Sequence, residues 1–317
     1  MDKPKVIVIC GPTASGKTKL SIELAKKING EIISADSMQI YKGMNIGTAK
    51  VTKEEMQGIK HYLIDIVSPD ERYSVADFKK DAEKSIKEIL KKNKVPIIVG
   101  GTGLYIDSII NGIEYNETNT NFQYREELEK IASREGLEKL YELAMKIDKE
   151  ATNKISKNDK KRIFRILEIY KSTGKTKTEL EIESRKKGTK YSFFVFGTNM
   201  EREKLYSKIN LRVDKMLEEG LIEEVKEIFE KYKTFPTSMQ GIGYKELKEY
   251  LDGICTKEEA IDKIKMETRR YAKRQITWFK RNKNIIWLDM QDSNMMQNHL
   301  NTILEVIRWK QKIIKNM

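Results

Sequence analysis

Residues 11–18 read GPTASGKT, and they lie between an apolar run at residues 6–10 and a helical apolar pattern at residues 20–28. A buried strand, a glycine-rich loop and a helix in this order are typical of a phosphate-binding P-loop, and these flanking segments disfavour a chance match. The backbone N–H groups of such a loop and the positive end of its helix bind an anion. This pattern predicts a protein that holds a diphosphate or triphosphate, and it leaves open whether that phosphate belongs to a nucleotide.

The residues of the loop have separate predicted roles. Gly11 and Gly16 let the backbone turn so that successive N–H groups face one anion. Lys17 adds a full positive charge, and Thr18 can bind Mg²⁺. The predicted diphosphate- or nucleotide-binding residues are Gly11, Pro12, Thr13, Ala14, Ser15, Gly16, Lys17 and Thr18, with Thr18 as the Mg²⁺ ligand.

Short runs rich in β-branched residues alternate with helical patterns in the first part of the chain. Near-continuous apolar strands separated by helices favour a parallel sheet that helices cover on both faces. We therefore expect an α/β fold, a P-loop NTPase-like parallel sheet flanked by helices. The predicted strands are residues 5–10, 31–34, 62–66, 95–99, 193–196 and 285–288, and the predicted helices between the early strands are residues 17–28 and 75–92.

The pattern changes between residues 115 and 190, where strand-like runs vanish and apolar residues recur at helical spacing. Polar stretches at residues 116–121 and 186–190 bound this segment. We expect a P-loop catalytic core made of residues 1–114 and 191–317, interrupted by an all-helical insertion.

Composition narrows the partners and the compartment. Lys and Arg number 61 against 48 Asp and Glu, and the net charge of +13 indicates either an acidic macromolecular partner or only a highly charged surface. Cys10 and Cys255 cannot form a disulfide framework, and we expect no secretory signal, which favours the cytoplasm. We expect no membrane span, because no apolar stretch is long enough, and no zinc site, because His61 and His299 lack cysteines at ligand spacing.

Polar residues follow three of the predicted strands: the P-loop, Asp36, and the stretch Gly100–Thr102. Ligands of parallel sheets bind beyond the carboxyl ends of the strands, so these residues outline one site. Asp36 can act as a general base or hold Mg²⁺, and the alternative is that it only caps a turn. Ser37 and Gln39 add hydrogen-bonding groups suited to the edge of a nucleobase.

Five blocks of sequence together resemble one enzyme family. They are GPTASGKT (11–18), SADSMQIYKGMNIGTAK (34–50), VGGTGLY (99–105), MQGIGYKEL (239–247) and RRYAKRQITWFKR (269–281). In this order, and over nearly the whole chain, they are similar to the tRNA dimethylallyltransferases, also called tRNA isopentenyltransferases. The resemblance implies transfer of a prenyl group from dimethylallyl diphosphate to N6 of adenine-37, beside the tRNA anticodon, to give N6-isopentenyladenosine and diphosphate.

The resemblance also implies catalytic roles for Asp36, Thr102 and Arg212. Adenine N6 is a poor nucleophile because its lone pair is delocalised, so a carboxylate that accepts its proton is what this reaction needs. Thr102 matches the family's threonine at the reaction centre, whereas the alternative is a threonine that caps the next helix. Arg212 shares an apolar stripe of the helix predicted around residues 205–229 with Leu205, so its guanidinium should bind an anion or extend to the edge. The resemblance implies that the anion is the diphosphate.

Two basic helix faces indicate nucleic acid. Lys161 and Arg165 share one face of the helix predicted at residues 159–171, opposite Ile163, Ile166, Leu167 and Tyr170. Residues 269–281 carry basic side chains on one half of a helix without an acidic residue, whereas merely solvated faces usually mix charges. Phosphate contact is therefore favoured over a solvated face. The basic residues of that segment are Arg269, Arg270, Lys273, Arg274, Lys280 and Arg281, and the other half carries Tyr271, Ala272, Ile276, Trp278 and Phe279.

The resemblance extends the predicted RNA contacts to Arg125 and to the loop Gly241–Tyr244. Tyr244 could stack on an extruded base, and the alternative is a flexible turn with a packed tyrosine. The predicted tRNA-binding residues are Asp36, Ser37, Met38, Gln39, Thr102, Arg125, Lys161, Arg165, Gly241, Gly243, Tyr244, Arg270, Lys273 and Arg274.

Two other functions share the P-loop. A small-molecule kinase would transfer phosphate from ATP without tRNA, and the basic face at residues 269–281 would then be incidental. An RNA-binding switch protein would bind RNA tightly and form no covalent product. In each case we expect a monomer that binds no membrane.

Overall fold

The structure is a computed structural model that describes residues 3–113, 122–292 and 295–315. The chain divides into two compact units, one made of residues 1–110 and 190–317 and the other of residues 111–189. The polar stretch predicted at residues 116–121 lies outside the described residues. Each unit has its own hydrophobic core, so each is described by itself.

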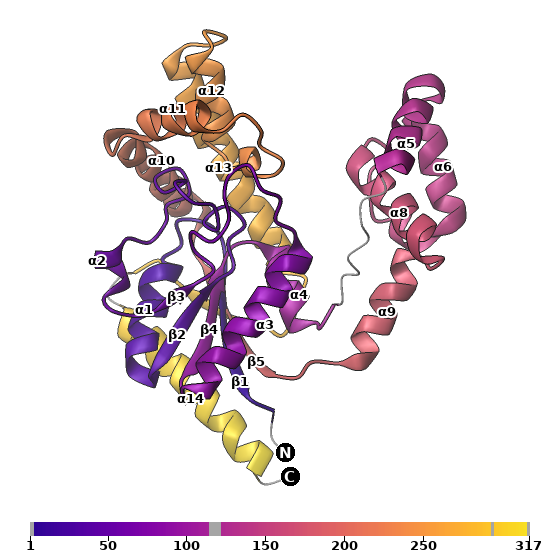
Figure 1. The fold of residues 1–317 in the computed structure, drawn as a ribbon. Coiled ribbons are helices and arrows are strands. Elements are labelled where there is room, and N and C mark those ends of the chain that lie inside the picture. The colour runs from indigo at the N-terminus through magenta and orange to yellow at the C-terminus, as the bar shows by residue number, and fades with distance from the viewer. Residues whose placement is uncertain (1–2, 114–121, 293–294, 316–317) are drawn as a thin grey trace. The chain divides into compact units, whose positions relative to one another are not determined.

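A six-stranded sheet forms the centre of the first unit (Figure 1). All neighbouring strands are parallel, in the order β3-β2-β4-β1-β5-β6. The predicted α/β fold with a parallel sheet is confirmed. The strands are β1 (Lys5–Cys10), β2 (Gly30–Ser34), β3 (His61–Tyr62), β4 (Val95–Gly100), β5 (Ser192–Asn199) and β6 (Ile286–Asp289).

The strand predicted at residues 62–66 is wrong in its extent. β3 ends at Tyr62, because Leu63 and Asp65 have φ angles of 61° and 55° in the left-handed region. An extended strand cannot pass through that region. Leu63, and Val67 just after this segment, are instead buried in the hydrophobic core.

Helices cover both faces of the sheet (Figure 1). Helices α1 and α14 pack with Ile9 and Phe196 on one face, and α3 and α4 pack with Val8 and Ile98 on the other. None of the described helices is both long and apolar enough to cross a membrane. The first helices of this unit are α1 (Lys17–Ile28), α2 (Lys53–Met56), α3 (Val75–Lys91) and α4 (Gly103–Ile110), and α14 (Met296–Lys315) ends the described chain.

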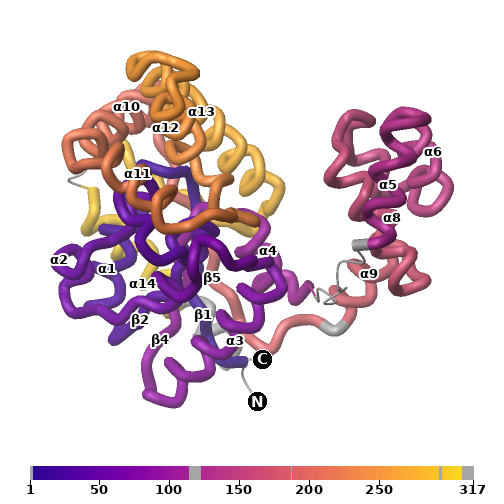
Figure 2. The backbone as a smooth tube through the Cα atoms, turned by 45° about the horizontal axis from the view of Figure 1, so that its top comes forward, coloured from indigo at the N-terminus to yellow at the C-terminus, as the bar shows by residue number. Residues whose placement is uncertain are grey.

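A separate group of helices packs together with residues that follow β2 (Figures 1 and 2). Its hydrophobic cluster includes Ile40, Tyr41 and Leu221. The single helix predicted around residues 205–229 is in fact two, because Gly220 has a φ of 99° and interrupts it. The elements are α10 (Arg202–Glu218), α11 (Leu221–Lys231), the 3₁₀ turn η1 (Ser238–Gln240), α12 (Tyr244–Leu251) and α13 (Lys257–Phe279).

The second unit is helical throughout its described residues. Leu128, Leu140, Ile163 and Leu167 belong to its core. The prediction that Tyr170 belongs to the apolar face of its helix is wrong, since this residue is exposed. The helices are α5 (Phe122–Glu135), α6 (Leu137–Ile147), α7 (Lys149–Thr152), α8 (Lys160–Thr173) and α9 (Lys177–Lys187).

Candidate active site

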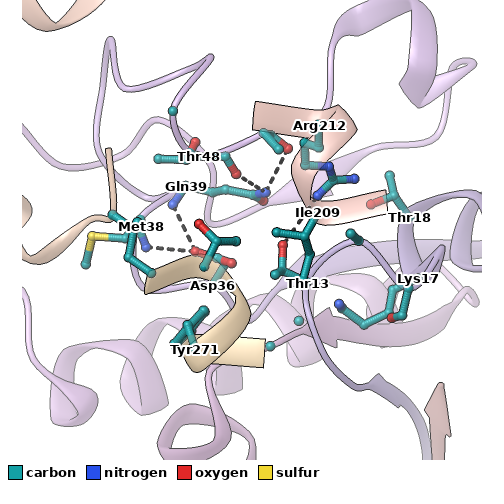
Figure 3. Close-up of a pocket in the computed structure, with 18 of the residues that line it drawn as sticks. Thr13, Lys17, Thr18, Asp36, Met38, Gln39, Thr48, Ile209, Arg212 and Tyr271 are labelled. Carbon is teal, nitrogen blue, oxygen red and sulfur yellow. Dashed lines mark hydrogen bonds between the residues drawn. The ribbon is translucent and has the colours of Figure 1, made fainter. Parts of the chain in front are cut away.

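The carboxyl ends of three central strands meet at one edge of the sheet. Cys10, the last residue of β1, pairs with Gly100 of β4, and Ser34 of β2 pairs with Val99. This register brings the P-loop, Asp36 and the Gly100–Thr102 loop together, as predicted from the polar residues that follow these strands. A cavity of about 730 Å³ opens there within the first unit, and Figure 3 shows its lining.

The P-loop is held by contacts within the core. A Cβ atom at Gly11 would lie 2.2 Å from Thr198 Oγ1, so only glycine fits this approach. The buried Ser15 hydroxyl donates to the Pro12 carbonyl at 2.7 Å and contacts Thr198 Oγ1 at 2.6 Å. The side chain of Ser15 therefore stabilises the loop. The prediction that Ser15 binds phosphate now concerns its backbone N–H.

Lys17 points back onto its own loop. Its Nζ donates to the Pro12 carbonyl at 2.6 Å. Burial lowers the pKa of Lys17 to about 8, the nearby Arg212 cation adds to this effect, and Asp36 opposes it. A bound anion would oppose both causes and raise this pKa. The loop thus holds a lysine whose positive charge is costly without a nearby anion.

Arg212 reaches the P-loop from helix α10. Leu205 and Ile209 on the same stripe are buried, as predicted, while the guanidinium opens onto the cavity. Its Nη1 lies 3.4 Å from Thr13 Oγ1. Desolvation by the surrounding protein lowers the pKa of Arg212, although the side chain remains accessible from the cavity. Two cationic side chains, Lys17 and Arg212, therefore line the cavity, and Figure 3 shows both beside the loop.

Asp36 uses its two carboxylate oxygens differently. Oδ1 accepts hydrogen bonds from the backbone N–H groups of Met38, at 2.9 Å, and Gln39, at 3.3 Å. Oδ2 accepts none from the described part of the chain. The turn-capping alternative is thus correct for one oxygen, and the other remains available to a ligand in the cavity.

Thr102 joins the Asp36 loop to the loop after β4. Its Oγ1 accepts a hydrogen bond from the Ser37 N–H at 3.0 Å. Its carbonyl, rather than its side chain, accepts from the Tyr105 and Ile106 N–H groups at the start of α4. The hydroxyl of Thr102 therefore orients the segment next to Asp36, and the helix-capping alternative does not describe this side chain.

The expectation that Gln39 offers its amide group to a nucleobase does not fit the structure. Its Nε2 donates to the Thr48 carbonyl at 3.2 Å and the Ala49 carbonyl at 3.1 Å. Both hydrogens of the amide are thereby used within the protein. Gln39 instead joins the Asp36 turn to the segment around residue 48.

Two residues of helix α13 belong to the cavity although sequence reasoning passed over their polar groups. Gln275 is buried, accepts from the Thr13 N–H at 2.9 Å, and donates to the Gly101 carbonyl at 2.9 Å. Tyr271 lines the cavity beside Asp36 (Figure 3), and burial together with that carboxylate raises its pKa. Gln275 lies on the apolar half of its helix, and a polar residue at that position is the sequence feature that could have identified it.

Tyr244 does not stand ready to stack on a base. Its ring is fully buried, and its hydroxyl donates to Glu224 Oε1 at 2.7 Å. The packed-tyrosine alternative is therefore the correct one for the side chain. Gly241 and Gly243 of the same loop do line the cavity.

The basic face of α13 is less uniform than its segment suggested. Arg270 forms an ion pair with Glu267, which lies just before the segment, at 2.6 Å. Arg274 lines the cavity, and Lys273 is exposed. Arg269 donates to Asn210 Oδ1 at 2.7 Å. Phosphate contact by Arg270, Lys273 and Arg274 stays a prediction.

In the second unit, the predicted RNA contacts lie on helices α5 and α8. Arg125 of α5 forms an ion pair with Glu168 of α8 at 3.1 Å, with its side chain partly exposed. Lys161 is exposed, and Arg165 is half-buried on the same helix. These positions are accessible, and their use in RNA binding also stays a prediction.

The fold and the cavity define a P-loop protein that binds a phosphorylated ligand next to a carboxylate. The model of the IPP transferase family matches residues 39–282, and this chain belongs to that family. The predicted family resemblance is confirmed.

Relatives match over nearly their whole length. A tRNA dimethylallyltransferase from Anoxybacillus flavithermus is 48% identical over 313 residues, which are 99% of each chain. Another from Acetivibrio thermocellus is 52% identical over 288 residues, 90% of this chain and 92% of its own.

Solved structures agree. A full-length tRNA isopentenylpyrophosphate transferase from Bacillus halodurans superposes with a TM-score of 0.74 at 44% identity, covering 99% of this chain and 100% of its own. A eukaryotic dimethylallyltransferase acting on tRNA gives a TM-score of 0.81 at 33% identity, covering 99% of this chain and 80% of its own.

Proposed function

We propose that this protein transfers the dimethylallyl group of dimethylallyl diphosphate to N6 of adenine-37 in tRNA. The observation that carries the proposal is one cavity with the P-loop, Lys17 and Arg212 at one end and Asp36 at the other, where Thr102 Oγ1 accepts from the neighbouring Ser37 N–H. The relatives' shared name supports tRNA as the acceptor and the dimethylallyl group as the group transferred, and the resemblance of the five sequence blocks implies the diphosphate donor and N6 of adenine-37. The products are N6-isopentenyladenosine and diphosphate.

The P-loop end binds the diphosphate and stabilises it as it leaves. When the bond between C1 of the prenyl group and the bridging oxygen breaks, the electron pair stays on the diphosphate. The loop amides, Lys17 and Arg212 face that growing charge, and such preorganised groups contribute several kcal/mol, about two orders of magnitude in rate for one group. The lowered pKa of Lys17 fits a group that gains its full charge together with a bound anion.

A divalent metal fits this end of the cavity, and we propose Mg²⁺. Mg²⁺ typically takes one or two protein oxygens and fills its shell with phosphate oxygens and water. The described residues contain no group of three His, Cys, Asp or Glu side chains that could hold an ion alone, so the ligand's phosphates must complete the site. Thr18, which lines the cavity, would hold the ion, which would supply charge neutralisation to the diphosphate.

Asp36 serves the acceptor end as the general base. As the bond between N6 and C1 forms, one N6 proton must leave. Oδ2 of Asp36 can accept it, while Oδ1 stays bound to the Met38 and Gln39 N–H groups and keeps the carboxylate oriented. Thr102 orients the neighbouring Ser37 segment.

The tRNA anticodon arm is the macromolecular partner in this proposal. Adenine-37 must leave its stack to reach the cavity, which costs a few kcal/mol. Basic side chains supply phosphate contacts from both units: Arg125, Lys161 and Arg165 in the helical insertion, and Arg270, Lys273 and Arg274 in the core. We propose that the protein acts as a monomer, and its tRNA substrate supports a cytoplasmic place of action.

The direct experiment uses labelled dimethylallyl diphosphate and unmodified tRNA. After incubation and digestion to nucleosides, the label should appear in N6-isopentenyladenosine. Phosphate transfer from ATP without tRNA, with no label on RNA, would instead favour the small-molecule kinase. RNA binding with no covalent product would favour the switch protein.

A further inference from the structure

The segment of residues 45–49 forms part of the cavity wall without belonging to a helix or strand. Gly47, Thr48 and Ala49 line the cavity beside the Asp36 turn. Hydrogen bonds from the Ala49 N–H to the Ile46 carbonyl and from the Lys50 N–H to the Asn45 carbonyl, each at 2.9 Å, close the turn, and the N–H groups of residues 45–47 need contacts from elsewhere.

Those contacts converge on Glu224 of helix α11. Its Oε2 accepts from the Asn45 N–H at 2.8 Å and the Ile46 N–H at 2.7 Å. Its Oε1 accepts from the Gly47 N–H at 3.0 Å and the Tyr244 hydroxyl at 2.7 Å. Two donors therefore occupy each oxygen, and no other side-chain group of this size can accept from all four.

Packing reinforces this clamp. A Cβ atom at Gly47 would lie 2.7 Å from the Tyr244 ring, so the ring lies directly against the backbone of residue 47. Tyr244 is itself fully buried. The segment can move away from α11 only if it breaks both the ring contact and the carboxylate contacts.

The other side of the segment leads to the proposed general base. Gln39 Nε2 donates to the Thr48 and Ala49 carbonyls, and the Gln39 N–H donates to Asp36 Oδ1. A continuous set of hydrogen bonds therefore runs from Glu224 through the segment and Gln39 to Asp36.

We propose that Glu224 is a positioning residue for prenyl transfer, which holds residues 45–49 so that Gln39 and the Asp36 turn keep their geometry at the acceptor end. The inference rests on the proposed function. It concerns the acceptor end alone, since Glu224 contacts neither Lys17 nor the rest of the P-loop.

Glu224→Gln is the decisive variant. The amide has nearly the same shape, but its NH₂ group faces two donors that previously met an oxygen. Leaving one such donor unsatisfied costs about 1–3 kcal/mol, which is about a 5- to 150-fold change. Amide hydrogen exchange at residues 45–47 should accelerate and single-turnover transfer to tRNA should slow by this factor, while the affinity for dimethylallyl diphosphate stays within about twofold.

Two variants serve as controls. Glu223→Gln makes the same chemical change at an exposed neighbour on α11 and should behave as wild type. Tyr244→Phe removes one of the four donors and leaves the three backbone contacts, so its effect should be clearly smaller than that of Glu224→Gln. If Glu224→Gln fails to fold, Gly47→Ala tests the same clamp, because it crowds the Tyr244 ring and leaves the carboxylate in place.

Outcomes separate this inference from the function on which it rests. Faster exchange and slower transfer at unchanged diphosphate affinity support the positioning role. Normal transfer in a folded Glu224→Gln protein overturns it, whatever the exchange shows, as does an equal loss in Glu223→Gln. If wild-type protein never labels tRNA, the proposed function itself fails, and the positioning role fails with it.

Discussion

The two ends of the cavity are built in different ways. The diphosphate end is local: one strand, one loop and one helix, contiguous in sequence, supply nearly all of it, and Arg212 is the main addition from afar. The acceptor end is assembled from remote segments: Asp36 and Tyr271 line it, Thr102 bonds to Ser37 beside Asp36, and the three come from separate parts of the chain. Local binding sites can be read from a motif, whereas assembled ones depend on the whole fold.

The contrast predicts that a change at the local end affects both ligand binding and transfer. Lys17→Ala should weaken dimethylallyl diphosphate binding and depress transfer by about two orders of magnitude, because it removes charge that stabilises the leaving group. Single-turnover transfer and ligand affinity measure both effects. Lys27→Ala, an exposed lysine on the same helix, is the matched control and should leave both unchanged. Equal behaviour of the two variants would remove Lys17 from the site.

Gln275 connects the two ends, so its loss should affect both. Gln275→Ala leaves the Thr13 N–H and the Gly101 carbonyl without their partner and should lower the free energy of unfolding by about 2 kcal/mol. Denaturant unfolding measures this, and both diphosphate affinity and transfer should fall. Thr277→Ala, an exposed position on the same helix, provides the control. If only diphosphate affinity or only transfer fell, Gln275 would not connect the two ends of the cavity.

The pH dependence of diphosphate binding should sharpen the assignment of Lys17. Its pKa of about 8 means that Lys17 is mostly charged below pH 8 and must take up a proton to bind an anion above it. Affinity should therefore fall as pH rises through 8, by up to about tenfold per pH unit. The arginine in Lys17→Arg stays protonated, so the fall in affinity that comes from deprotonation of Lys17 should vanish in this variant. The titration of the ligand itself affects both proteins equally. Identical profiles would contradict the assignment.

The smallest expected effects concern the RNA faces. Replacing Lys161 and Arg165 by Gln, or Lys273 and Arg274 by Gln, should weaken tRNA binding several-fold and flatten its salt dependence. Affinity for dimethylallyl diphosphate should hold for the pair on α8. Binding titrations at several salt concentrations provide the slopes. An unaltered slope would show that the face is only solvated.

Sequence reasoning succeeded where chemistry is contiguous. The strand, loop and helix around GPTASGKT and the polar residues after β2 and β4 follow from local patterns and from the rule that parallel strands share an edge. The short β3 could not be foreseen, because the strand ends at the left-handed φ of the buried Leu63, a conformation that the residue type itself does not indicate. The same holds for the break at Gly220, which a helical apolar pattern concealed.

Long-range hydrogen bonds account for the remaining errors. The sequence favours a contact between Gln39 and a nucleobase, because its actual partners cannot be identified from sequence. They are the carbonyls of Thr48 and Ala49, which are backbone groups that every residue has. Gln275 and Thr13 are separated by 262 positions, and nothing in either local sequence indicates their contact. Tyr244 was open to two interpretations until its burial against Gly47 was visible.

The most direct test compares Asp36→Asn with Lys17→Ala in the same two assays, prenyl diphosphate affinity and single-turnover transfer to tRNA. We predict different results for the two variants. Asp36→Asn keeps an oxygen for the Met38 and Gln39 N–H groups, so it should bind dimethylallyl diphosphate normally yet lose about 10²–10⁴-fold in transfer, whereas Lys17→Ala should lose both. Near-normal transfer by Asp36→Asn, or a binding defect relieved by raised Mg²⁺, would contradict the assignment of the general base.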